Sequence, residues 1–386
     1  MKSLLTCTLI LGISIGSAHA DKYTSLKKEV EQSIARGSNW LLKQQHADGY
    51  WDDPELPAFT ALALNAIVRD PSLKKVDGKL PAKVEKGFQW LLKQQKEDGG
   101  IYNRGLGTYN TATSVTAMMA AMSATGRKDF EPAVVKARAY LIGAQWDAGE
   151  KGKADNINDG GIGYGSDDSY TNLSSTYLAI EAIALSESVV ADGKYGDQPK
   201  LNWGAALTFL SRCQNLEETN DQKWASDDPV NKGGVVYRPG ESKGEDVVTE
   251  GGRVALRSYG SMTYAGMLSM IYAKVDVNDP RVVAMKSWLG ANYTLDENPG
   301  LGPQGIYYYF QAMAKALTAA QMDTLPLKDG KQVDWRMELG SKLLQLQREN
   351  GSWVNDNGRF MESNAVLVSS YSVLALEQLY DSFPKK

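Results

Sequence analysis

The sequence predicts an all-α protein in which six helical hairpins form a double ring, an α6/α6 toroid. Three observations favour this fold. A helix–turn–helix unit recurs six times along the chain. Within each unit the first helix carries charged residues, whereas the second is small or apolar on nearly every face. No stretch alternates with a period of two over a useful length. Because a helix that is apolar all round is buried, the second helices should form the inner ring.

The six units follow one another along the chain. Their paired helices are expected at Leu26–Gln45 and Pro57–Val68, Pro81–Gln95 and Tyr109–Ala124, Pro132–Gln145 and Tyr170–Leu185, Asn202–Gln214 and Val254–Ala273, Pro280–Tyr293 and Gly305–Leu317, and Asp334–Gln347 and Glu362–Tyr380. Four of these helices have a proline near the first turn, where its missing N–H costs little. Lys27-Lys28-Glu29 is typical of the outer helices, and Thr60-Ala61-Leu62-Ala63-Leu64 is typical of the inner ones. Units three and four also carry inserts.

One segment is spelled almost identically in the first two units. Residues 40–51 read WLLKQQHADGYW and residues 90–102 read WLLKQQKEDGGIY. Glycine permits the turn between two helices. Glutamine can hydrogen-bond exposed peptide groups at a helix end, and tryptophan can cover the junction while donating from its indole. We therefore interpret the segment as structural: it should fasten each hairpin to the next.

The first 20 residues have the features of a secretory signal peptide. Lys2 supplies a positive start, Leu4–Ile15 is a short apolar run, and Ser17–Ala20 offers small residues for cleavage. The run is too short to span a bilayer. We expect export to the periplasm or the extracellular space.

Composition excludes several classes of protein. The net charge is -4 with both signs mixed along the chain, so no basic patch indicates nucleic acid. No other segment is long and apolar enough for an integral membrane span. Without Cys7, which leaves with the signal peptide, only Cys213 remains, so no disulfide can form within the chain.

The repeated segment resembles the QW repeat of squalene–hopene and oxidosqualene cyclases. Unit one carries the pattern as Arg36-Gly37, Trp40-Leu41, Gln45, Gly49 and Trp51. The resemblance implies the α/α toroid that those cyclases share with protein prenyltransferase β subunits and complement-type thioester domains. Residues 21–386 would then form a single toroid domain with six QW-like repeats.

Later units are similar to exported bacterial prenyltransferase and squalene-oxidase repeat proteins. The segments that carry this likeness are Gly160–Tyr164, Leu256–Gly266 and Asp296–Gly302. The resemblance implies no established activity. Gln311 stands where a histidine would be expected in such relatives, which weakens any acid–base role at that position.

Motifs for zinc and thioester chemistry are missing. Prenyltransferases hold zinc with Asp, Cys and His, but neither Asp nor Cys occurs in Leu256-Arg257-Ser258, where the motif would fall. After removal of the signal peptide the chain has one histidine, His46, and one cysteine, Cys213. The thioester sequence Gly-Cys-Gly-Glu-Gln is also absent. We expect no metal and no cofactor.

The acid motif of class II terpene cyclases, Asp-x-Asp-Asp, is absent as well. Such an acid protonates an alkene or epoxide, because burial and neighbouring carboxylates raise its pKa. Asp167 and Asp168 are the best-placed substitutes, since they come just before an expected inner helix. The alternative interpretation is that an aspartate at this position caps the helix.

The sequence supports a binding site better than it supports a catalytic one. Parallel inner helices open their N-termini at one end of the ring, and their dipoles make that mouth attractive to anions. Candidate ligand-binding residues at the mouth are Arg253, Arg257, Tyr259, Tyr170, Tyr307, Tyr308 and Gln304; Tyr109, Asp168 and Glu362 are also expected there. Alternatively, the tyrosines pack against neighbouring helices and the arginine pair clamps a loop.

These observations favour an exported toroid that binds an unknown small molecule, isoprenoid or glycan, or a protein partner at the mouth. The rival is an enzyme: a class II terpene cyclase with a non-standard acid, or a carbohydrate-active toroid with paired carboxylates. A closed apolar cavity with one protonated aspartate would favour the cyclase. An open cleft with two facing carboxylates would favour the glycan enzyme, and an open polar mouth with neither would favour partner binding.

The first prediction concerns metal. We expect the purified mature protein to contain no stoichiometric zinc and to remain folded in chelator, because a structural zinc site normally takes four Cys or His ligands. Elemental analysis and circular dichroism with and without chelator measure this. One tightly bound zinc per chain would contradict it.

Overall fold

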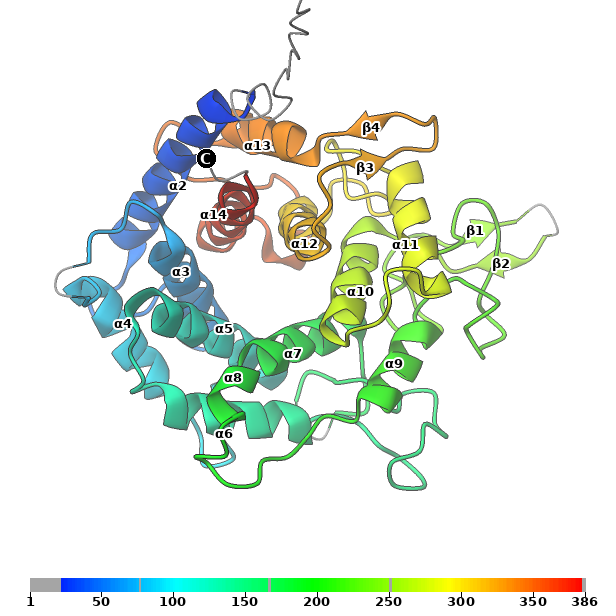
Figure 1. Cartoon of the computed structure of the whole chain (residues 1–386), viewed down its shortest axis with the longest axis horizontal. Coiled ribbons are helices and arrows are strands. Elements are labelled where there is room, and N and C mark those ends of the chain that lie inside the picture. Colours follow the sequence, from blue (N-terminus) through cyan, green and yellow to red (C-terminus); the bar gives the residue numbers. More distant parts are fainter. Residues whose placement is uncertain (1–21, 76–77, 166–167, 250–251, 384–386) are drawn as a thin grey trace, which may run out of the picture.

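Two concentric rings of helices make up the computed structural model of the protein (Figure 1). It describes residues 22–75, 78–165, 168–249 and 252–383. The predicted signal peptide, residues 1–20, and Asp167 lie outside the described residues.

The outer ring consists of the first helix of each unit. These are α2 (Thr24–Gln44), α4 (Ala82–Leu92), α6 (Glu131–Gly143), α9 (Trp203–Arg212), α11 (Pro280–Ala291) and α13 (Trp335–Leu346). The second helices form the inner ring: α3 (Pro57–Arg69), α5 (Gly107–Thr125), α7 (Leu173–Leu185), α10 (Gly260–Tyr272), α12 (Ile306–Ala319) and α14 (Ala365–Ser382). Inner helices contact one another in chain order, and α14 closes the ring against α3. The predicted toroid is confirmed.

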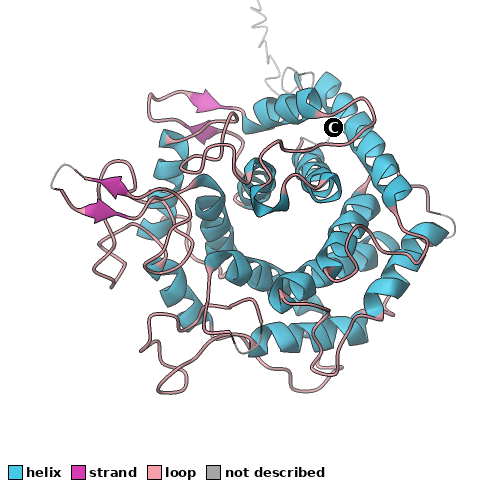
Figure 2. Ribbon diagram, turned by 180° about the vertical axis from the view of Figure 1, so that it is seen from behind, coloured by secondary structure: helices cyan, strands magenta, loops and turns pink. Residues whose placement is uncertain are grey.

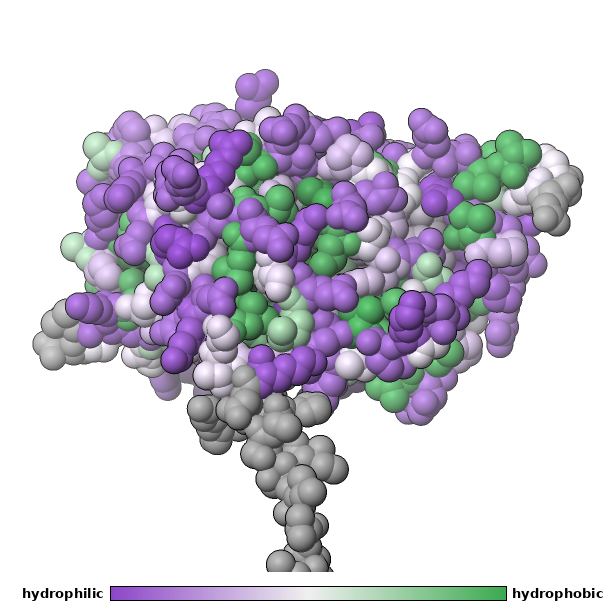
Figure 3. All heavy atoms as spheres, turned by 90° about the horizontal axis from the view of Figure 1, so that it is seen from above, coloured by the Kyte–Doolittle hydropathy of each residue, from purple (hydrophilic) through white to green (hydrophobic). Residues whose placement is uncertain are grey.

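Burial follows the charge pattern. Helix α3 buries every residue from Pro57 to Val68, whereas α2 buries a single stripe that includes Val30, Ile34 and Leu41. The charged faces of the outer helices remain in solvent, and the side of the molecule drawn in Figure 3 is mostly hydrophilic with small, separate hydrophobic patches. Within the described ranges, no helix has both the length and the apolar content needed to cross a membrane.

Small elements outside the rings were not predicted. Strand β1 (Val247–Val248) pairs antiparallel with β2 (Val254–Ala255), and β3 (Leu325–Pro326) pairs with β4 (Gln332–Val333). Both hairpins lie at the periphery (Figure 2). A four-residue helix, α8 (Glu187–Val190), and a 3-10 turn, η1 (Arg359–Met361), were not predicted either. Two-residue strands carry too little alternation to be seen in a sequence.

Three inner helices begin three or more residues later than expected. The helix expected from Glu362 begins at Ala365, because Asn364 caps it. The helix expected from Val254 begins at Gly260, because Val254 pairs with Val248 in a hairpin and the Tyr259 N–H donates to the carbonyl of Val235. The helix expected from Tyr170 begins after Asn172, whose side chain accepts the N–H of Ser175 and so caps α7.

A glutamine side chain fastens neighbouring hairpins together. Gln45 Nε2 donates to the carbonyl of Gly49 in its own turn and to the carbonyl of Lys83 in the next outer helix, both at 2.9 Å. The same double donation recurs for Gln95 (to Gly99 and Ala133), Gln145 (to Gly160 and Asn202), Gln214 (to Gly233 and Arg281) and Gln347 (to Gly351 and Ser33). The last of these joins unit six to unit one and closes the outer ring.

Tryptophan and glycine complete the joint. Trp51 is buried and its Nε1 donates to the carbonyl of Leu41 at 2.6 Å. Its ring lies against Gly87 of the next outer helix, where a Cβ would come within 2.9 Å of the indole. Gly49 has φ +108°, and a Cβ there would lie 2.8 Å from the carbonyl of Lys86. The repeated segment is therefore a structural fastener, as its residue types predicted.

The second prediction tests this joint. Gln45→Ala leaves the carbonyls of Gly49 and Lys83 without their side-chain donor, so we expect the free energy of unfolding to fall by about 1–3 kcal/mol. Gln44→Ala is the matched control, because Gln44 is exposed and contacts only a carbonyl of its own helix; its change should stay within about 0.5 kcal/mol. Urea unfolding measures both. Equal effects of the two substitutions would show that the joint contributes nothing.

Candidate ligand-binding site at the mouth of the inner ring

The N-terminal ends of the inner helices surround a cavity of about 260 Å³. Residues of their first two turns and preceding loops contribute to its walls: Leu106 and Tyr109 at α5, Ser174 and Ser175 at α7, Ser261 and Met262 at α10, Gly305 and Tyr308 at α12, and Leu367 and Tyr371 at α14. This is the arrangement expected of parallel inner helices, whose N-termini must open at one end.

Aromatic and apolar side chains dominate the lining. Six tyrosines contribute: Tyr109, Tyr164, Tyr237, Tyr259, Tyr308 and Tyr371. Six further side chains are hydrophobic: Leu106, Met262, Leu301, Phe360, Met361 and Leu367. Lys243 is the one charged residue, and no carboxylate lines the cavity, among the residues that the structure describes. The cavity therefore offers apolar surface with scattered hydroxyl groups.

Three tyrosines form the floor of the cavity. The hydroxyls of Tyr109 and Tyr371 are hydrogen-bonded at 2.7 Å, and the rings of Tyr308 and Tyr371 lie 5.8 Å apart. The same three residues also line a polar hole of about 20 Å³ on their other side. That hole contains Glu181 and Lys315, which form an ion pair at 2.7 Å. The floor thus separates an apolar compartment from a polar one deeper in the ring.

Burial keeps the floor tyrosines protonated. It raises the pKa of Tyr109 to about 12 and the pKa of Tyr371 well above its usual value. Both residues are neutral phenols at physiological pH, so each hydroxyl retains its proton.

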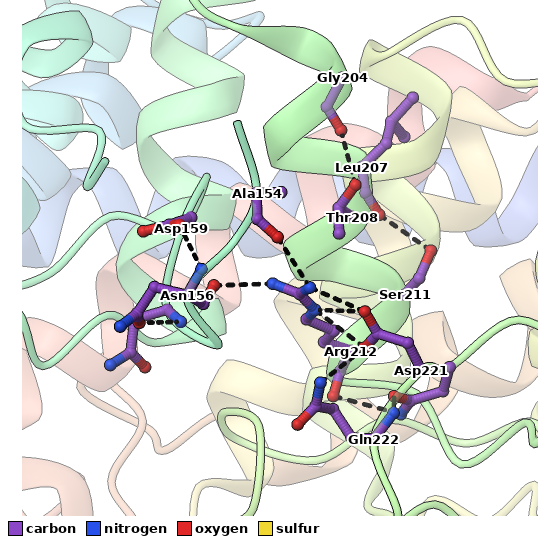
Figure 4. A network of polar contacts seen from close by, with 12 residues as sticks. Ala154, Asn156, Asp159, Gly204, Leu207, Thr208, Ser211, Arg212, Asp221 and Gln222 are labelled. Atoms are coloured by element: carbon purple, nitrogen blue, oxygen red, sulfur yellow. Dashed lines mark hydrogen bonds and ion pairs between the residues drawn. The ribbon is translucent and has the colours of Figure 1, made fainter. Parts of the chain in front are cut away.

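Inserts of units three and four build one wall of the cavity. The two inserts are joined by Arg212, at the end of α9 (Figure 4). Its guanidinium binds Asp221, with Nη2 2.7 Å from Oδ2, and donates to the carbonyls of Asn156 at 2.7 Å and Ala154 at 3.0 Å. Because Arg212 is buried and its donors are used on both inserts, the two loops are held against each other.

Two tyrosines of this wall come from equivalent turns. Tyr164 ends the sequence GGIGY and Tyr237 ends GGVVY, and their hydroxyls are hydrogen-bonded to each other. The Lys243 ammonium lies 4.3 Å from the centre of the Tyr237 ring, a cation–π contact. Sequence reasoning missed all three residues. The shared Gly-Gly-x-x-Tyr spacing in units three and four was the signal that could have found the tyrosines.

A charged layer lies behind the wall. The Arg238 guanidinium stacks 4.0 Å from the Tyr170 ring and donates to Asn158. Tyr170 and Lys243 both donate to Glu241, at 2.7 and 2.5 Å. Burial acts to raise the pKa of Glu241, but these hydrogen bonds outweigh it and lower the pKa below its usual value. Glu241 is therefore ionised, and its carboxylate accepts hydrogen bonds from both Tyr170 and Lys243.

A polar hollow of about 570 Å³ adjoins the cavity. The two share Lys243 and Leu301. The hollow is lined by Arg257, Gln304 and Arg359, together with the carboxylates Glu245, Asp246 and Glu297. Arg257 is half-buried, and its guanidinium makes no hydrogen bond or ion pair with any other described residue.

Four of the seven predicted ligand-binding residues lie at these two spaces. Tyr259 and Tyr308 line the cavity, and Arg257 and Gln304 line the hollow. Tyr170 lies in the charged layer behind the wall.

The other two predicted residues point elsewhere. Tyr307 is buried and its hydroxyl lies 3.3 Å from the carbonyl of Val354. Arg253 donates to the carbonyls of Lys223 and Ala225, so it clamps a loop. Because the chain is extended here, Arg253 and Arg257 do not share a helix face as the spacing of four suggested.

Asp168 fastens a loop. Its two carboxylate oxygens accept the N–H groups of Tyr164 at 2.9 Å and Tyr170 at 2.8 Å. It does not cap α7, because Asn172 does, and it is not among the residues that line the cavity. Its partner in the predicted acid pair, Asp167, lies outside the described residues.

Glu362 lies at the mouth and caps an inner helix. It is fully buried and accepts the N–H groups of Tyr307 and Tyr308 in the first turn of α12. Burial raises its pKa despite these hydrogen bonds. Its oxygens face the helix terminus, so its role in the structure is to satisfy backbone donors.

Comparison with known proteins agrees with the architecture. Residues 34–145 match the family described as squalene-hopene cyclase N-terminal domain. The chain is similar to a variant of the type II terpene cyclase MstE from Scytonema in complex with geranylgeranyl dihydroxybenzoate, with a TM-score of 0.50 and 13% identity over 93% of this chain and 99% of that chain. For the apo form of MstE the TM-score is 0.47 and the sequence identity 13%, over 92% of this chain and 99% of that chain. For a protein from Actinoplanes the TM-score is 0.47 and the identity 12%, over 92% of this chain and 99% of that chain.

The chain has the terpenoid cyclase fold, and its residues 34–145 are similar to the N-terminal domain of squalene-hopene cyclases. No curated protein matches its sequence. At 13% identity the structural likeness establishes the fold and not the reaction.

The third prediction concerns Asp168. In Asp168→Asn one carboxylate oxygen becomes an NH₂ group that faces a backbone N–H, so one hydrogen bond is lost and we expect destabilisation of about 1–3 kcal/mol. Asp53→Asn is the control, because a single oxygen of Asp53 accepts a single N–H, from Glu55, and an asparagine can do the same. Thermal unfolding compares the two. An unchanged melting temperature in Asp168→Asn would contradict the loop-fastening role.

Proposed function

We propose that this chain is an exported toroid that binds an elongated, mainly apolar small molecule. The apolar part would occupy the tyrosine-lined cavity, and a polar or anionic end would lie in the adjoining hollow. The charged start and short apolar run of residues 1–20 support export. The observation that carries the binding proposal is the lining of the cavity: six tyrosines, six hydrophobic side chains and no carboxylate among the described residues.

The size and polarity of the site favour an isoprenoid-like ligand over a glycan. A cavity of about 260 Å³ is close to the lower end, roughly 300 Å³, of small-molecule pockets. A glycan would bring many hydroxyl groups that each need a hydrogen-bond partner, whereas this lining is largely hydrophobic. A glycan-cleaving enzyme would also need two facing carboxylates. The fold neighbour that holds geranylgeranyl dihydroxybenzoate suggests isoprenoids as the first probes.

The fourth prediction tests occupancy of the cavity. We expect the purified protein to bind farnesol saturably at one site, measured by isothermal titration calorimetry and native mass spectrometry. Ser174→Phe places a ring in the cavity and should weaken binding at least about tenfold, ~1.4 kcal/mol. Leu185→Phe adds a ring at the exposed other end of the same helix and should leave affinity unchanged. Absence of binding, or equal effects of both substitutions, would refute the proposal.

Conversion of the probe distinguishes the rival class. If the wild-type protein cyclises farnesol or squalene, as detected by gas chromatography, the protein is an enzyme and the binding proposal is wrong. Loss of that turnover in Asp168→Asn, with the fold retained, would point to the non-standard acid.

The fifth prediction concerns the polar end of the ligand. Arg257 presents a planar fork of donors in the hollow without a protein partner among the described residues. Arg257→Ala should weaken binding of farnesoate, which carries a carboxylate, by about 1–3 kcal/mol, and should affect farnesol much less. Arg253→Ala removes an arginine four residues away that clamps a loop, so it should spare farnesoate binding. A larger loss in Arg253→Ala would overturn the assignment of the hollow.

A further inference from the structure

Two tyrosine pairs in the cavity each hold an unused proton. The hydroxyl of Tyr109 bonds that of Tyr371 at 2.7 Å, and the hydroxyl of Tyr164 bonds that of Tyr237. Each phenol carries one proton, and a bond between two phenols uses only one of the two. None of these four hydroxyls donates to any other group in the described part of the chain. One O–H of each pair is therefore free to donate.

The floor pair is the more constrained of the two. Tyr371 is 6% exposed, and burial raises the pKa of both floor residues, so both protons remain at neutral pH. The lining supplies no described carboxylate to accept the free proton. A buried donor without an acceptor costs free energy that a suitable ligand would recover.

Geometry limits how far a ligand can enter. Tyr109, Tyr308 and Tyr371 belong both to the cavity and to the polar hole beneath it. An apolar molecule in the cavity must therefore end against the floor pair. Whatever group stands at that end meets a phenolic O–H in otherwise apolar surroundings.

We propose that the ligand carries a hydrogen-bond acceptor oxygen, a carbonyl or ether, at its buried end, and that the Tyr109–Tyr371 pair donates to it. This inference rests on the proposed function and specifies its ligand class. An oxygen at the floor would take the free O–H while the rest of the molecule keeps apolar contact with the walls. A pure hydrocarbon would fill the same space and leave the donor unpaired.

A matched pair of probes tests the proposal. Geranylacetone is an isoprenoid ketone; its hydrocarbon counterpart has CH₂ in place of the carbonyl. We expect the purified protein to bind the ketone about tenfold more tightly, ~1.4 kcal/mol, measured by calorimetry on both compounds. Equal affinities would overturn the acceptor subsite while leaving the proposed function intact. If neither compound binds, the proposed function fails as well.

Phenylalanine substitutions locate the donor. In Tyr109→Phe or Tyr371→Phe alone, the remaining hydroxyl loses its partner and its own proton becomes free, so the ketone preference should persist. The double substitution Tyr109→Phe/Tyr371→Phe removes both hydroxyls of the pair, leaves the Tyr308 hydroxyl on the floor, and should abolish the preference; Tyr308→Phe alone should preserve it. A purely structural role for the pair would not produce this difference between single and double variants.

Two controls complete the experiment. Affinity for the hydrocarbon should be unchanged in all variants, which verifies that the cavity is intact. Tyr264→Phe removes a buried hydroxyl that does not line the cavity and has no partner in the described chain, so it should leave both affinities unchanged. If the preference survives the floor double variant but disappears in Tyr164→Phe/Tyr237→Phe, the acceptor oxygen binds at the wall, and the floor assignment is wrong.

Discussion

The double donation of a glutamine amide is the interaction on which the toroid depends. Both protons of the Nε2 group are used: Gln347, for example, donates at 3.0 Å to Gly351 in its own turn and at 3.0 Å to Ser33 in the first outer helix. Each such amide fixes the position of one hairpin against the next. Since the final one joins the end of the chain to its beginning, the ring is closed by the same contact that builds each step.

One joint in the described chain lacks the glutamine, and its replacement clarifies what the contact does. At the end of α11 the corresponding position is Tyr293, whose hydroxyl donates to Glu338 of α13 at 3.0 Å. The bond again links the end of one outer helix to the next, but it ends on an exposed side chain. A backbone carbonyl is fixed by its helix, whereas a carboxylate on a flexible stem is not. The amide is therefore the stiffer fastener, which explains its recurrence.

Periodicity was sufficient to predict the helices, but not the parts of the site that lie between them. Helix α11 was expected from Pro280 and begins there, because apolar spacing and a first-turn proline are local signals. Tyr259 and Tyr308 were predicted to lie at the mouth because they stand near the start of inner helices, whose N-termini open there.

Residues on the inserts could not be found in this way. Tyr237 and Lys243 reach the cavity because Arg212 holds two inserts together, and Arg253 is withdrawn from it by a hairpin of two-residue strands. These are contacts between segments distant in the sequence, which no local pattern encodes.

The protonation states of the described groups at the mouth favour hydrogen bonding to a ligand over proton transfer to it. An acid that protonates an alkene must carry its proton at a carboxyl group facing the substrate. Glu241 is ionised by its neighbours, and Glu362, although burial raises its pKa, turns its oxygens to the N–H groups of α12. The floor residues Tyr109 and Tyr371, which do face the cavity, are phenols, and burial raises the pKa of both, which makes them weaker acids still. Weak acids that keep their protons are poor initiators of cyclisation and good hydrogen-bond donors, and a cavity lined with them is suited to hold an oxygen acceptor in place.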